Sequence, residues 1–104
     1  MSEASTSHAD QPRFKVASHV VSRLIQGRAL VLDASRDEIQ QLNEVGSYLW
    51  EQLMQGPQSE QSLVRAVTER FEVREPEAAS DVGAFTAELL QRGLITQLDQ
   101  PSEA

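Results

Sequence analysis

Hydrophobic and polar positions follow short, regular periods through the middle of the chain. Two runs rich in leucine and β-branched residues, 19–25 and 28–33, flank Gln26-Gly27, a dipeptide typical of a two-residue hairpin turn. After a polar turn at 34–37, the apolar positions Ile39 and Leu42 end a further extended segment. The pattern predicts a three-stranded antiparallel meander, with the third strand, ending at Leu42, at an edge of the sheet.

Beyond this strand the apolar spacing changes to that of a helix. Val45, Leu49, Trp50 and Leu53 form one helical stripe, and Asn43 precedes it as a residue that can cap a helix start. We therefore predict a first helix over about 44–55, which Gly56-Pro57 ends.

Two more helices follow with their own start and stop signals. Ser59 is a good cap for the second, and Pro76 suits the first turn of the third, which Gly93 ends. Their apolar positions are Leu63, Val64, Val67 and Phe71 in the second helix, and Ala78, Val82, Phe85, Leu89 and Leu90 in the third. Residues 94–96 then predict a short strand that can return to the sheet. The order β-β-β-α-α-α-β predicts an α+β, winged helix-turn-helix-like fold.

Composition limits what this domain can be. With 104 residues the chain has room for one domain, which we place at 14–98. Residues 1–13 and 99–104 are polar and predict disordered tails. Cysteine is absent and every apolar run is far shorter than a membrane span needs, so we expect a cytoplasmic protein without a membrane partner.

Candidate catalytic chemistry is sparse. A glycine-rich phosphate loop, a metal-spaced cluster and a nucleophile motif are all missing from the sequence. His19 falls in a predicted strand, where a surface position is expected rather than a catalytic one. We therefore expect a protein that is not an enzyme and that has no cofactor or metal.

The assembled motifs resemble the PqqD family of peptide-binding domains, also called RiPP recognition elements. The resemblance covers about 20–95. Its motifs are Leu30-Val31-Leu32-Asp33, Leu42-Asn43-Glu44-Val45-Gly46, Leu49-Trp50, Phe71-Glu72-Val73, Asp81-Val82-Gly83-Ala84-Phe85 and Gly93-Leu94-Ile95.

The resemblance implies a function without catalysis. Such domains bind the leader segment of a ribosomally made precursor peptide and present it to a modifying enzyme, often a radical S-adenosylmethionine protein, as in pyrroloquinoline-quinone biosynthesis. The leader would add a strand beside the third strand and lay side chains against the third helix. The peptide-binding residues this implies are Glu38, Ile39, Gln40, Gln41 and Leu42 in the strand, and Asp81, Val82, Phe85, Leu89 and Arg92 in the helix. In this scheme Val82, Phe85 and Leu89 floor the groove, and Arg92 meets an acidic leader residue.

Two other functions stay open. A winged helix suggests DNA binding, but the net charge is −7, and 59–92 carries more acidic than basic residues. Nucleic acid would be repelled by such a field, so no nucleic-acid partner is expected. The other alternative is a homodimer that pairs through the same open edge.

Overall fold

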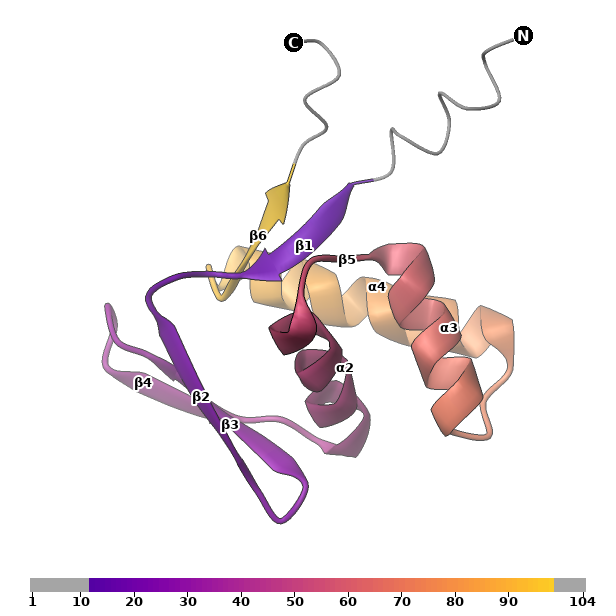
Figure 1. The fold of residues 1–104 in the computed structure, drawn as a ribbon, viewed down its shortest axis with the longest axis horizontal. Coiled ribbons are helices and arrows are strands. Elements are labelled where there is room, and N and C mark those ends of the chain that lie inside the picture. The colour runs from indigo at the N-terminus through magenta and orange to yellow at the C-terminus, as the bar shows by residue number, and fades with distance from the viewer. Residues whose placement is uncertain (1–11, 99–104) are drawn as a thin grey trace, which may run out of the picture.

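The structure is a computed structural model that describes residues 12–98, in which two small antiparallel sheets accompany three helices (Figure 1). In chain order the elements are β1 (Arg13–Val16), β2 (Val20–Ile25), β3 (Arg28–Asp33), β4 (Glu38–Gln41), α2 (Glu44–Gln55), β5 (Gln58–Ser59), α3 (Glu60–Arg70), α4 (Glu75–Gln91) and β6 (Ile95–Leu98). The predicted α+β class is confirmed, and the winged-helix-like arrangement is consistent with this order.

The predicted meander forms one of the sheets, with strand order β2-β3-β4. Ile25 pairs with Arg28 across a two-residue turn in which Gln26 and Gly27 have φ of 53° and 79°. Two consecutive positive φ values define the hairpin turn whose twist matches that of the strands. β4 pairs with β3 in the antiparallel register and, within residues 12–98, with no other strand.

The three helices begin and end close to the predicted positions. Asn43 caps α2 by accepting a 2.7 Å hydrogen bond from the Gly46 N–H, and Ser59 caps α3 by accepting one of 3.1 Å from the Ser62 N–H. Gly93 follows α4 with φ of 75°, in the left-handed region that glycine adopts without strain. These local signals were therefore sufficient to set the helix boundaries.

The second sheet, with order β5-β1-β6, was not predicted. Residues 94–96 were expected to return to the meander, and this expectation is wrong, because β6 pairs antiparallel with β1 instead. His19 lies in the turn between β1 and β2 rather than in a strand. Arg13, placed in the predicted N-terminal tail, is the first residue of β1. The remaining predicted tails, at 1–11 and 99–104, lie outside the described residues.

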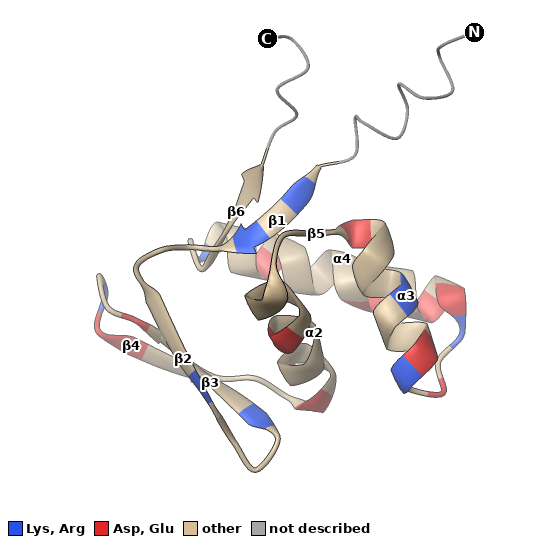
Figure 2. Cartoon of the chain, viewed as in Figure 1, with Lys and Arg blue, Asp and Glu red and all other residues tan. Residues whose placement is uncertain are grey.

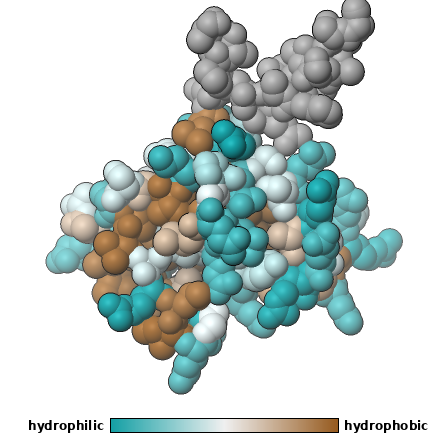
Figure 3. Space-filling model, in the orientation of Figure 1, coloured by the Kyte–Doolittle hydropathy of each residue, from teal (hydrophilic) through white to brown (hydrophobic). Residues whose placement is uncertain are grey.

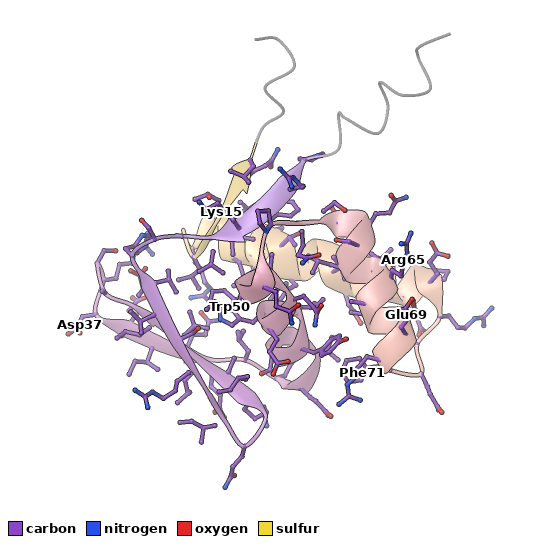
Figure 4. All side chains as sticks on the ribbon, viewed as in Figure 1. Lys15, Asp37, Trp50, Arg65, Glu69 and Phe71 are labelled. Carbon is purple, nitrogen blue, oxygen red and sulfur yellow. The ribbon has the colours of Figure 1, made fainter. Side chains whose placement is uncertain are left out.

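The hydrophobic core lies where α2 meets the β2-β3-β4 sheet on one side and α3 and α4 on the other (Figure 1). Trp50 points from α2 into this core and is 1% exposed (Figure 4). Its indole N–H donates a 2.8 Å hydrogen bond to the Ser22 hydroxyl on β2. The predicted stripe of α2 is thus the packing face that fixes the helix against the sheet, with Leu49 and Leu53 buried beside Trp50.

Candidate functional site

The free edge of β4 offers backbone hydrogen-bonding groups to an incoming chain. In an antiparallel ladder, successive residues direct their N–H and C=O alternately toward and away from a given neighbour. The N–H of Leu42 donates to the Ala29 carbonyl at 2.9 Å, so Leu42, Gln40 and Glu38 face β3. The backbone groups of Ile39 and Gln41 therefore point to the open side.

A hollow of about 430 Å³ lies beside this edge. Its lining residues are Val31, Asp33, Glu38, Ile39, Gln40, Arg92 and Leu94. Val31 and Leu94 are buried and form its apolar bottom, while β4 supplies one wall and the residue that follows α4 the other. We call this the β4–α4 hollow.

A second hollow of about 300 Å³ continues between the start of α2 and the middle of α4. Its lining residues are Asn43, Val45, Gly46, Leu49, Asp81, Ala84, Phe85 and Glu88. A side chain at Gly46 would not fit freely, since an added Cβ would lie 3.3 Å from Cε1 of Phe85 and 3.1 Å from Oδ1 of Asn43. Glycine lets the Phe85 ring pack against the α2 backbone and so shapes this α2–α4 hollow.

An ion pair at the end of α4 links the linings of the two hollows. Glu88 lines the α2–α4 hollow and Arg92 the β4–α4 hollow, and Nε of Arg92 lies 3.2 Å from Oε2 of Glu88. The spacing of four residues brings both side chains to the same helix face. Together the two hollows form a groove that follows β4, the start of α2 and α4, which we call the β4–α4 groove.

Asp33 puts a buried carboxylate into the β4–α4 hollow. Its Oδ1 accepts hydrogen bonds from the Ser35 hydroxyl at 2.7 Å and the Ser35 N–H at 3.0 Å, and lies 3.5 Å from Nε2 of His19. The hydroxyl bond is the main reason that the pKa of Asp33 lies below its usual value of 3.8, against the opposing effect of burial. Asp33 is therefore ionised at neutral pH.

The charges along the β4–α4 groove are mostly negative. Four carboxylates line it, those of Asp33, Glu38, Asp81 and Glu88, against the guanidinium of Arg92. Arg92 was expected to meet an acidic leader residue, but the structure already gives it Glu88 as a partner. An acidic side chain entering the groove would have to compete with Glu88.

The ten residues singled out from the sequence divide into surface and core. Glu38, Ile39, Gln41, Asp81 and Arg92 are exposed, and Gln40 and Phe85 are half-buried. Leu42, Val82 and Leu89 are 6%, 0% and 1% exposed and belong to the hydrophobic core. Val82 and Leu89 line neither hollow, since their side chains face inward from α4, and their role in peptide binding stays a prediction.

Several groove residues were not identified from the sequence. Val31 and Leu94 form the bottom of the β4–α4 hollow, and Ala84 and Glu88 line the α2–α4 hollow. Asp81, Ala84, Phe85, Glu88 and Arg92 recur at the helical spacing, so their stripe was readable beside the core stripe. The signal was weak because this stripe is mixed in polarity.

Other kinds of site find little support in the described part of the chain. Within residues 12–98 no group of three His, Asp or Glu side chains is placed to hold a metal ion. In the same residues no helix is long and apolar enough to cross a membrane. The sequence of α4, the helix that would read DNA, contains four acidic residues and no Lys or Arg.

Comparison with known proteins gives a family and a fold. Residues 28–95 match the family model described as coenzyme PQQ synthesis protein D (PqqD). Among solved structures, the chain is similar to TbiB1 in complex with the TbiA(beta) leader peptide, with a TM-score of 0.73 and 26% identity, over 78% of this chain and 93% of that one. It is also similar to a lasso peptide synthetase B1 complexed with the leader peptide, with a TM-score of 0.70 and 22% identity, over 80% and 96% of the two chains. Comparison with curated protein sequences gives no match.

Proposed function

The chain belongs to the PqqD family, and from this premise we propose that it binds the leader segment of a ribosomally made precursor peptide and presents it to a modifying enzyme. The observation that carries the proposal is the free edge of β4 lying along the β4–α4 groove. TbiB1, which has the same fold, is solved with a leader peptide.

The leader would bind as an added strand of the β2-β3-β4 sheet. The outward N–H and C=O groups of Ile39 and Gln41 would hydrogen-bond to its backbone, which demands little of the leader sequence. Because β4 is short and has the polar sequence EIQQ, it can stay exposed without a ligand and not promote aggregation.

Selectivity would come from leader side chains that enter the two hollows. Alternate residues of an added strand point to the same side, so apolar side chains on that side can contact Val31 and Leu94 in one hollow and Phe85 in the other. The four carboxylates of the groove favour a leader that carries Lys or Arg near these positions and disfavour Asp and Glu.

The chain would supply binding and orientation, and a separate modifying enzyme would supply the reaction. The acidic α4 argues against the DNA-binding alternative, since a helix that enters the major groove must approach two rows of phosphates. We therefore favour peptide presentation in the maturation of a peptide-derived natural product, by a pyrroloquinoline-quinone type or another pathway.

An NMR titration tests the proposal directly. ¹⁵N-labelled full-length chain would be titrated with synthetic leader segments of the short precursor genes that neighbour its own gene, with a scrambled peptide as control. We expect the amide signals of Ile39, Gln41 and 81–92 to shift together, and the Ile39 and Gln41 amides to become protected from hydrogen exchange.

The positions of the amide signals that shift decide whether the leader adds a strand to β4. A leader that shifts only signals outside β4 and α4, or that leaves the Ile39 and Gln41 amides unprotected, would show that strand addition to β4 is wrong. The TbiA(beta) leader serves as a heterologous peptide that tests selectivity. A salt-sensitive complex with duplex DNA, centred on α4, would instead support the DNA-binding alternative.

A further inference from the structure

The other edge of the same sheet has a different character. β2 has the sequence VVSRLI, and within residues 12–98 it pairs with β3 alone. Among these residues, the exposed large hydrophobic side chains are Val21, Leu24, Ile25, Ile39 and Met54. Three of the five come from β2 and a fourth, Met54, from the adjacent end of α2, on the side of the sheet away from β4. An apolar edge strand of this length promotes association unless another chain covers it.

The ladder fixes which backbone groups of β2 are free. Ile25 and Arg28 close a two-residue hairpin, so Ile25, Arg23 and Val21 bond to β3. The intervening residues Ser22 and Leu24 direct their N–H and C=O to the open side of β2, opposite β3. The Val20 N–H is already used, because it donates to the Ala17 carbonyl at 3.2 Å.

Apolar side chains and a hollow adjoin this free edge. The hollow has a volume of about 300 Å³ and is lined by Ser22, Arg23, Leu24, Trp50, Glu51, Met54 and Gln55. The Ser22 hydroxyl accepts from the Trp50 indole and lies 3.8 Å from Sδ of Met54. Figure 3 shows apolar residues gathered over the part of the molecule that contains the β2-β3-β4 sheet.

We propose that β2 pairs antiparallel with β2 of a second copy of this chain, so that two meanders form one continuous six-stranded sheet. A two-fold axis normal to the sheet places the same face of both copies on one side, where Leu24 and Met54 of each copy approach those of the other. A pairing centred on Ser22 or on Leu24 sets Arg23 opposite an apolar residue. A pairing centred on Arg23 would set two guanidinium groups opposite each other and is disfavoured.

The charge distribution along β2 opposes a second copy less than the net charge of the chain does, and in the adjoining hollow the lining carboxylate is Glu51, with Arg23 in the same lining. The chain has a net charge of −7, so its copies repel in most orientations. Acidic residues are absent from 12–32, and the Asp and Glu residues lie mainly on the helices and β4 (Figure 2). Two chains that meet along β2 therefore bring no carboxylates together within the paired strands.

The length of β2 sets the strength of the dimer. Six residues at about 3.4 Å each give a contact of about 20 Å along the strand. Such a contact buries less surface than the roughly 1,200 Å² of a stable interface, so the dimer should form reversibly with concentration. The β2–β2 dimer leaves β4 free, so each copy can hold its own leader, and dimerisation does not depend on the proposed function.

Sedimentation equilibrium of the full chain, without ligand, tests this pairing. Between about 5 μM and about 500 μM the weight-average mass should rise from 11.5 kDa toward twice that value, with a parallel change in Trp50 fluorescence.

Leu24→Pro removes an N–H that faces away from β3, so it should lower the association constant at least tenfold and spare the hairpin. Leu24→Lys provides the same test without a change in backbone. Gln41→Pro, on the opposite edge, is the matched control and should leave the association constant unchanged.

The results decide whether β2 pairs with β2 of a second copy. A chain that stays at 11.5 kDa throughout, or one whose association is lost with Gln41→Pro but not with either Leu24 variant, overturns the proposal. A fall of at least tenfold in the association constant of both Leu24 variants, with that of Gln41→Pro unchanged, supports it. Leader titrations of the same variants separate the two proposals. A variant that no longer self-associates but still binds the leader bears only on the pairing of β2. A chain that still dimerises but does not bind the leader contradicts leader binding at β4 and leaves the pairing of β2 intact.

Discussion

A proline at position 41 should weaken leader binding without breaking the sheet. The N–H of Gln41 points to the open side of β4, because Leu42 and Gln40 are the residues that bond to β3. Proline lacks this donor and is tolerated in an edge strand where the N–H faces away from the neighbouring strand. Gln41→Pro therefore removes one hydrogen bond to the added strand and none of the β3–β4 ladder.

The size of the effect follows from that single bond. A backbone hydrogen bond contributes a net of about 1 kcal/mol, which corresponds to about a fivefold increase in the leader Kd. Gln40→Pro provides the contrast, since the Gln40 N–H lies in the ladder opposite Val31. That change should lower the free energy of unfolding by about 1–3 kcal/mol, whereas Gln41→Pro should lower it by less than about 1 kcal/mol.

Isothermal titration calorimetry with one leader peptide, combined with urea denaturation of each variant, measures both quantities. Leu24→Pro is the control for a proline in the opposite edge and should leave the leader Kd unchanged. If Gln41→Pro binds the leader as tightly as the unmodified chain while remaining folded, the leader does not hydrogen-bond to that edge. If Gln40→Pro and Gln41→Pro destabilise the fold equally, the assignment of inward and outward backbone groups is wrong.

Three further predictions concern the groove and the core. Gly46→Ala should displace the ring of Phe85 and strain the Asn43 cap, because the new methyl group would lie 3.3 Å from Cε1 of Phe85 and 3.1 Å from Oδ1 of Asn43. It should raise the leader Kd, with little change in stability by urea denaturation, since the strain at the cap offsets the higher helix propensity of alanine. Ser35→Ala should raise the pKa of Asp33 toward its usual value. The stability that the lowered pKa provides is present above pH 3.8 and is lost as the pH falls below it, so unfolding curves from pH 2 to 7 should show a smaller acid-dependent loss in this variant. Trp50→Phe removes the indole bond to β2 and should lower the free energy of unfolding by about 1–2 kcal/mol in urea, with leader binding retained.

The parts of the fold that were predictable from the sequence depend on local chemistry. Gly27 in the hairpin, Asn43 and Ser59 as caps and Gly93 after α4 each satisfy a backbone requirement within a few residues. Such requirements are visible in a short window of sequence. The second sheet is not visible in this way, since β1 is the four-residue segment RFKV and its partner β6 follows about 80 residues later.

The groove was harder to predict for a related reason. On α4 the strongest apolar period, which includes Val82 and Leu89, marks the stripe that enters the core. The adjacent stripe, with Phe85 between Asp81 and Glu88, faces the groove and alternates in polarity. A site for a ligand must stay exposed without one, so its residues carry less apolar character than the core and give a weaker sequence signal.

The contrast between the two edges of the β2-β3-β4 sheet bears on how a small domain keeps a peptide site open. Both edges offer backbone groups, and without further control either edge could pair with another copy. β4 reads EIQQ and adjoins four carboxylates, so two copies meeting there would bring like charges together in the groove. β2 reads VVSRLI and has no acidic residue near it in sequence, so self-pairing costs less at that edge. Acidic residues around β4 would thus direct self-association to β2 and leave β4 available to a leader of opposite charge.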